Sequence, residues 1–102
     1  MKNTTDNKAL LMAVYLNDID KVNWLLAAGA DPNCYAEELK MRPLNHAIAN
    51  RNYAMLKLLL NHDADPFLKD KDGQSIREIV SCYNDKEMQK IFDDALIKKD
   101  TI

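Results

Sequence analysis

A four-residue motif that occurs twice constrains the fold of this chain more than any other feature. Gly29-Ala30-Asp31-Pro32 returns as Asp63-Ala64-Asp65-Pro66, a shift of 34 residues from Asp31 to Asp65. The same shift aligns six apolar pairs: Leu10 with Leu44, Ala13 with Ala47, Val14 with Ile48, Val22 with Leu56, Leu25 with Leu59, and Leu26 with Leu60. A fixed period of this length indicates stacked supersecondary units, each too small to bury its own apolar face.

Within one period the apolar spacing predicts two short helices. The residues at helical spacing are Leu44, Ala47 and Ile48 in the first helix, and Met55, Leu56, Leu59 and Leu60 in the second. Asn50-Arg51-Asn52 predicts a tight polar turn between them. Gly29 can adopt the left-handed conformation that ends a helix, and Pro32 cannot continue one. Asp63 occupies the position of Gly29, and a short polar residue tolerates that conformation. The repeated motif therefore predicts a helix stop followed by a turn.

Three segments resemble the ankyrin repeat, whose unit is about 33 residues long and opens with T-P-L-H-x-A. Arg42-Pro43-Leu44-Asn45-His46-Ala47 is similar to that opening. Leu56 to Pro66 and Trp24 to Pro32 are similar to the K-L-L-L-x-x-G-A-D-V ending of the family. Asp72-Gly73-Gln74-Ser75 resembles the D-G-x-T that opens a third copy, which continues through Ile79, Val80, Met88, Ile91 and Phe92. Together the three copies cover nearly the whole chain.

The resemblance implies an all-α ankyrin-repeat solenoid, in which stacked helix-turn-helix units are joined by hairpin-like loops. At 102 residues the chain is the size of one domain, and we expect units at 6–36, 37–69 and 70–97 with a tail at 98–102. Lys8-Ala9-Leu10-Leu11 replaces T-P-L-H in the first unit, and Arg77 replaces the core Leu in the third. Both are edge units, where polar substitution is expected. One extra residue between Cys34 and Lys40 predicts a wider first hairpin loop.

The resemblance also implies that a partner binds the concave side, which hairpin tips and the exposed faces of the first helices form. Carried over by position, the binding residues are Tyr15, Leu16, Glu38, Leu39, Met41, Ala49, Asn50, Lys71, Asp72, Gln74, Cys82 and Tyr83. Aromatic residues and Met are typical of interface cores. The alternative is that Leu39 and Met41 fold back over the hairpin base while Tyr15 and Tyr83 cover the groove floor.

The sequence contains no arrangement of residues typical of metal or catalytic sites. His46, His62, Cys34 and Cys82 have no ligand-type neighbour at zinc-site spacing, so no metal and no cofactor are expected. We interpret His46 as a partly buried structural residue and His62 as a helix C-terminal residue. The adjacent acidic pairs Glu37-Glu38 and Asp93-Asp94 are interpreted as solvated, and two glycines leave no phosphate-binding loop. The chain is therefore not expected to be an enzyme.

Charge and hydropathy exclude two further classes of partner. Fourteen basic and 16 acidic residues leave a net charge of -2, so nucleic acid is not expected as a partner. No signal peptide or membrane-spanning stretch is recognised, and Met88 to Ile97 is interpreted as a capping helix instead of a membrane-binding one. Two unpaired cysteines favour a reducing, cytoplasmic compartment, with export into a host cell as the alternative. Trp24 is interpreted as a packing residue, in part exposed at the N-terminal edge.

These observations predict a non-catalytic module, monomeric on its own, that binds another protein through its concave face. Two other functions are compatible with the same sequence. One is a dedicated inhibitor or antidote that blocks an enzyme or a toxin. The other is a secreted effector that acts on a host protein. Ankyrin-type folds carry many unrelated interactions, so the fold does not name the partner.

Overall fold

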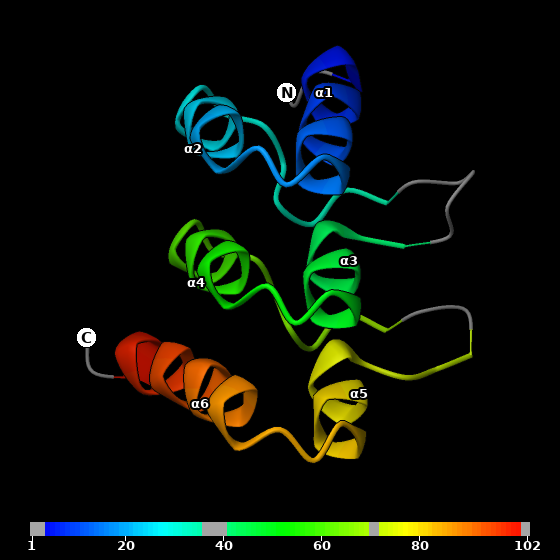
Figure 1. Cartoon of the computed structure of the whole chain (residues 1–102), viewed down its shortest axis with the longest axis vertical. Helices are drawn as coiled ribbons and strands as arrows, with labels where there is room; N and C mark the ends of the chain where they lie inside the picture. Colours follow the sequence, from blue (N-terminus) through cyan, green and yellow to red (C-terminus); the bar gives the residue numbers. More distant parts are fainter. Residues whose placement is uncertain (1–3, 36–40, 70–71, 101–102) are drawn as a thin grey trace.

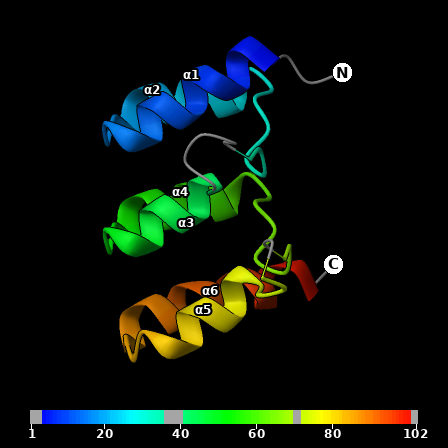
Figure 2. The same cartoon turned by 90° about the vertical axis from the view of Figure 1, so that its right-hand side faces the viewer.

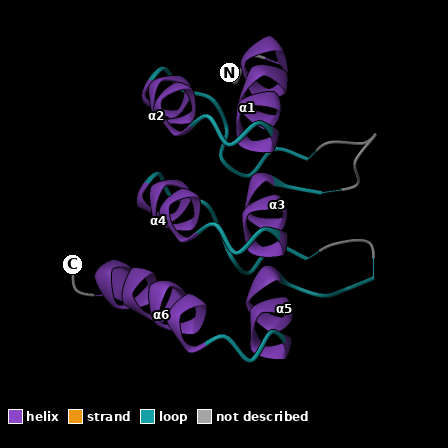
Figure 3. Cartoon of the chain, in the orientation of Figure 1, coloured by secondary structure: helices purple, strands orange, loops and turns teal. Residues whose placement is uncertain are grey.

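The computed structural model describes residues 4–35, 41–69 and 72–100, and these residues form six helices (Figure 1). In chain order the helices are α1 (Thr4–Tyr15), α2 (Ile19–Ala27), α3 (Pro43–Ala49), α4 (Tyr53–Asn61), α5 (Ile76–Cys82) and α6 (Lys86–Asp100). Loops connect them, and no strand is drawn in the described part of the chain (Figure 3). Lys69 and Ser75 form an isolated antiparallel β-bridge in the loop before α5. The prediction of an all-α solenoid is confirmed.

The helices stack in two columns, and this arrangement decides which residues share a surface. The inner column consists of α1, α3 and α5, which lie on the side of the interrepeat loops, and the outer column consists of α2, α4 and α6 (Figure 1). A quarter turn about the vertical axis shows the three helix pairs as three parallel layers (Figure 2). Each layer is one repeat. The central repeat, α3 with α4, contacts a neighbour on both sides, whereas the first and third repeats each have one open end.

The core lies between the two columns and follows the period of the sequence. Every member of the six aligned apolar pairs belongs to one buried cluster, and none of these side chains is more than 7% exposed. The third repeat adds Ile76, Val80, Met88, Ile91 and Phe92 to the same cluster. Fully burying a Leu, Ile or Met side chain stabilises the fold by about 1.5–3 kcal/mol. The stack is therefore held together by apolar contacts that run through all three repeats.

The same type of turn connects each inner helix to its outer partner. A residue with positive φ is followed by an N-cap residue, whose side-chain oxygen accepts a hydrogen bond from the backbone N–H three positions later. The residues with positive φ are Asn17 (59°), Arg51 (51°) and Asn84 (53°). The N-cap residues are Asp18, Asn52 and Asp85, at 3.2, 3.2 and 3.1 Å from the backbone nitrogens of Lys21, Met55 and Met88. The tight turn predicted at Asn50-Arg51-Asn52 is confirmed.

The repeated motif ends α2 and α4 as predicted. Gly29 has φ 105° and Asp63 has φ 69°, both in the left-handed region. The next backbone N–H then donates back to a carbonyl in the last turn, from Ala30 to Leu25 at 3.0 Å and from Ala64 to Leu59 at 3.1 Å. Asp31 and Asp65 follow, and each accepts a backbone hydrogen bond two residues on, at 2.9 and 2.8 Å. The motif is thus a helix stop joined to an aspartate-stabilised turn.

Trp24 and Arg77 lie in the first and third repeats, at the two edges of the stack. Trp24 was expected to be a packing residue that is in part exposed at the N-terminal edge; it is 67% exposed, so the exposure is confirmed and the packing role is wrong. Arg77, at the position of the core Leu, is half-buried and pairs with Asp93 at 2.8 Å between Nη2 and Oδ1. The wider first hairpin loop falls on residues 36–40, outside the described residues.

Candidate functional site: the inner helix ends

Six of the predicted binding residues occupy two equivalent positions at the C-terminal ends of the inner helices. Tyr15, Ala49 and Cys82 share one position, and Leu16, Asn50 and Tyr83 share the next. Tyr15 is 57% exposed and Leu16 is 65% exposed, which is unusual for side chains of this size. Ala49, Asn50 and Cys82 are exposed, and Tyr83 is half-buried. Because the three inner helices lie parallel in one column, the structure places these pairs along one side of the stack (Figure 2).

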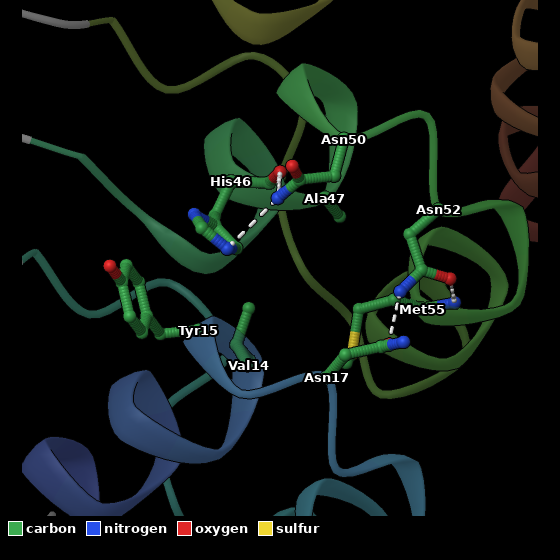
Figure 4. A pocket seen from close by; sticks show the side chains of 8 residues that line it. All are labelled: Val14, Tyr15, Asn17, His46, Ala47, Asn50, Asn52 and Met55. Carbon is green, nitrogen blue, oxygen red and sulfur yellow. Dashed lines mark hydrogen bonds between the residues drawn. The ribbon is translucent and has the colours of Figure 1, made fainter.

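A hollow of about 360 Å³ opens between the first two members of this row (Figure 4). It is lined by Val14, Tyr15, Asn17, His46, Ala47, Asn50, Asn52 and Met55. The Tyr15 ring lies 5.2 Å from the His46 ring, centroid to centroid, at 35°. Asn50 Nδ2 lies 2.9 Å from His46 Nε2, and an amide nitrogen donates, so Nε2 is the acceptor. The hollow thus has an apolar floor and a rim of amide, imidazole and phenol groups.

Two contacts between the first and second repeats shape this hollow. Asn52 Nδ2 donates to Asn17 Oδ1, which ties the turn of the second repeat to that of the first. His46 is half-buried, which confirms the interpretation of a partly buried histidine, and its ring lies against Tyr15 of the preceding repeat. Sequence reasoning did not assign His46 to the binding face. Its spacing of four residues from Asn50, one helical turn, is the signal that could have indicated a shared surface.

A cluster of polar and aromatic groups holds the third repeat against the second. The Arg51 guanidinium lies 5.3 Å from the Tyr83 ring centroid, and its Nη1 is 2.9 Å from Asp85 Oδ2. Tyr53 donates its hydroxyl to the same oxygen at 2.6 Å. This hydrogen bond is the main reason why the pKa of Asp85 is lowered and that of Tyr53 is raised. Of these contacts, the one with the Arg51 guanidinium involves Tyr83, the last residue of the row.

Three of the six predicted loop residues lie in the described part of the chain. Met41 is half-buried, and Asp72 and Gln74 are exposed. Glu38, Leu39 and Lys71 lie outside the described residues. Arg42, which sequence reasoning did not select, joins the loops, because its Nε donates to the Asn33 carbonyl at 3.2 Å and its guanidinium lies 5.4 Å from the Tyr35 ring centroid. The binding assignment of all these residues stays a prediction.

No arrangement for metal chemistry is present in the part of the chain that the structure describes. No group of three or more His, Cys, Asp or Glu side chains there could hold a metal ion. His62 is the C-cap residue of α4, as predicted. No helix within the described ranges is long and apolar enough to cross a bilayer. The chemistry that the described surface offers is recognition through aromatic, aliphatic, amide and imidazole groups.

Comparison with known proteins agrees with this architecture. Residues 25–80 match the family described as ankyrin repeats in many copies. The chain is 41% identical over 68 residues to the 2-5A-dependent ribonuclease of Homo sapiens, a match that covers 67% of this chain and 9% of that protein. It is 32% identical over 77 residues to an ankyrin repeat-containing protein of Treponema pallidum, covering 76% of this chain and 26% of the relative. The crystal structure of an ankyrin repeat domain from Acinetobacter baumannii AYE superposes with a TM-score of 0.72 at 27% identity, covering 84% of this chain and 46% of that one.

The chain therefore belongs to the ankyrin repeat family. Ankyrin repeats are in general protein-interaction modules without catalytic activity. The chain spans about a tenth and a quarter of the length of the two relatives named above. The ribonuclease activity in the name of the human relative belongs to that whole protein.

Proposed function

We propose that this chain is a non-catalytic protein-binding module, and that its partner contacts the row of inner helix ends. The observation that carries the proposal is the exposure of Tyr15 and Leu16 beside the His46–Asn50 hollow. Aromatic anchors next to a preformed hollow are the composition from which most binding energy arises in protein interfaces. Because Tyr15, His46 and Tyr83 are already held by neighbours, little conformational entropy is lost when a partner binds.

The row offers three kinds of contact to a protein surface. Tyr15 and Leu16 present apolar area at the first repeat. Asn50 and Asn17 present amide groups suited to peptide groups, whereas the Asn52 amide already bonds Asn17 Oδ1 and the Met55 N–H. Tyr83, with the Arg51 guanidinium over its ring, presents an aromatic edge and a cation at the third repeat. We infer that a partner inserts an apolar side chain between the first two repeats and aligns backbone groups along the asparagines.

The internal repeat supplies a conservative test. Tyr15→Ala with Leu16→Asn places the residues of the second repeat, Ala49 and Asn50, at the equivalent positions of the first, so the fold is expected to persist. Partners captured from the native source by the unmodified chain should be lost by this double variant. The matched control, Lys57→Ala with Lys90→Ala, changes two exposed residues of the outer helices and should retain them. A partner retained equally by both variants would contradict the assigned surface.

The identity of the captured protein then separates the general role from the narrower ones. If it is an enzyme or a toxin, its activity is measured with and without a stoichiometric amount of the chain. Inhibition that the Tyr15→Ala, Leu16→Asn variant fails to produce would establish a dedicated inhibitor or antidote. Unchanged activity in the complex would establish an adaptor. A captured protein that comes from a host cell would favour the effector role.

A further inference from the structure

The N-terminal end of the stack carries exposed side chains that the proposed binding function does not use. Trp24 on α2 is 67% exposed and Met12 on α1 is 59% exposed. Lys21 and Ala28 on α2 are also exposed. We call Met12, Lys21, Trp24 and Ala28 the N-terminal end face.

The position of Trp24 faces the preceding repeat wherever there is one. Its equivalents are Leu58, 34 residues later, and Ile91, a further 33 residues later. Ile91 of α6 lines a hollow of about 230 Å³ together with Lys57, Leu60 and Asn61 of α4, so it points toward the preceding repeat. It is 8% exposed, and Leu58 is half-buried against the core. Trp24 has the same register, and its neighbouring layer is absent from the described stack.

Met12 and Lys21 of the N-terminal end face also lie at positions that face the preceding repeat. Met12 is equivalent to His46, whose ring lies against Tyr15 of the repeat before it. Lys21 is equivalent to Met55 and Met88, both 0% exposed, and Met55 lines the larger hollow with Val14 and Asn17 of the first repeat. The N-terminal end face is therefore a repeat-stacking surface, with one cation where the other repeats have Met.

The C-terminal end of the stack is built differently. In the third repeat, Asp93 occupies the position of Leu26 and Leu60, and Arg77 occupies the position of Leu10 and Leu44. All four leucines are buried. These two side chains form an ion pair at 2.8 Å that is 29% exposed on Arg77 and 53% on Asp93. An apolar end face would have to desolvate this pair if it stacked there, which is costly. Head-to-tail association of two copies is therefore disfavoured.

We propose that a second copy of this chain covers the N-terminal end face, giving a two-fold dimer in which the first repeats of both copies stack on each other. An isologous contact of this kind closes on itself, whereas head-to-tail contacts would form open filaments. The molecule measures 33 × 32 × 24 Å, and its longest axis runs along the stack in Figure 1, so the contact is limited to a 32 × 24 Å cross-section. Specific dimers need about 600 Å² per partner at the lower end of their range, which a cross-section of this size can accommodate. Two Trp24 side chains would be the central anchors.

This proposal replaces the expectation of a monomer and leaves the inner helix ends free in both copies. The test is sedimentation velocity of the full chain without an added N-terminal tag, over concentrations from about 1 µM to 1 mM. We expect a reversible dimer with a dissociation constant on the order of 10 µM. Trp24 is the single tryptophan of the chain, so its fluorescence should shift to shorter wavelength over the same concentration range.

Two substitutions at the N-terminal end face should act in opposite directions. Trp24→Lys should weaken the dimer at least about 30-fold, as expected for loss of a central aromatic anchor. Lys21→Met introduces the residue of the other two repeats and should tighten the dimer about 10-fold. Phe67→Ser, at a 55% exposed residue in the loop after α4, is the control and should change nothing. Tyr15→Ala with Leu16→Asn should likewise leave the dimer intact, which separates this proposal from the binding function.

Three outcomes would overturn the proposal. The first is a wild-type chain that stays monomeric at about 1 mM with an unchanged fluorescence spectrum. The second is a dimer that Trp24→Lys leaves intact. The third is a concentration-dependent series of species larger than a dimer, which indicates head-to-tail stacking. Circular dichroism of each variant verifies that it folds, and the high exposure of Trp24 predicts that Trp24→Lys does.

Discussion

The two ends of the repeat stack expose side chains of different character. At the C-terminal end, Arg77 and Asp93 replace leucines and pair with each other, which gives that end a polar surface. At the N-terminal end, the large apolar side chains of Met12 and Trp24 are exposed. A repeat array is stable in water only when its last layers have polar outer faces. The difference indicates that the stack is capped at one end by its own residues, and that the other end retains the character of an interior boundary.

Exchanging residues between a central and a terminal repeat should give the largest effect. Leu44→Arg places the residue of the third repeat at a position that is 1% exposed in the second. An uncompensated buried charge costs about 3–5 kcal/mol, so this variant should be largely unfolded. The reverse exchange, Arg77→Leu, should change the free energy of unfolding by about 1 kcal/mol or less, because its ion pair is partly exposed. Urea denaturation of both variants measures the contrast; equal losses would mean that the C-terminal end is packed like the centre.

Making the C-terminal end apolar should remove the asymmetry between the ends. Arg77→Leu combined with Asp93→Leu restores the residues of the first two repeats. The double variant should keep its helical circular dichroism spectrum but form species larger than a dimer, because both ends can then stack. Asp93→Asn is the control, since it removes the charge without adding apolar area. If the double variant sediments like the wild type, the ion pair is not what closes that end.

The N-cap residues of α2 and α6, Asp18 and Asp85, allow the two ends to be compared through the pH dependence of stability. The hydrogen bond from Tyr53 and the ion pair with Arg51 lower the pKa of Asp85 below its usual value of 3.8. Because the folded-state pKa is lowered, this group stabilises the fold above its unfolded-state pKa and loses that contribution as the pH falls through the folded-state value. Asp85→Asn should therefore lower stability at neutral pH and flatten the acid limb of the stability profile. Asp18→Asn is the matched substitution at the exposed N-cap of α2 in the first repeat.

The two cysteines provide the smallest perturbation, because labelling changes no residue. Burial and the nearby Asp31 charge raise the pKa of Cys34 in the first repeat to about 11, so about one thiol in a thousand is ionised at pH 8. Cys82 in the third repeat is exposed. Iodoacetamide at pH 8 should alkylate Cys82 first and Cys34 only after denaturation, as followed by mass spectrometry. Rapid labelling of Cys34 in the folded chain would show that the first repeat opens and exposes this thiol.

Much of the fold could be predicted because the apolar spacing and the helix stops occur in more than one repeat. The apolar pairs from Leu10 to Leu60 predict the helices and the core, and the Gly29 and Asp63 stops predict their ends. The binding face that we propose overlaps in part with the one predicted from the sequence. Tyr15 and Leu16 are exposed where the resemblance placed them, but His46 was assigned a purely structural role. Its contact with Tyr15 joins different repeats, and a pattern within one unit does not reveal which side chains meet across a boundary.

The sequence by itself determined the number of repeats, the two helices in each, and the residues that form the core, because these follow from apolar spacing and local capping. The tertiary structure decided what each equivalent position does. Trp24, Leu58 and Ile91 share one register, yet the first is 67% exposed and the last is 8% exposed. Burial depends on whether a layer lies beside the residue, and that is a property of the assembled stack. For the same reason the structure, and not the motif, distinguishes the polar C-terminal end from the apolar N-terminal one.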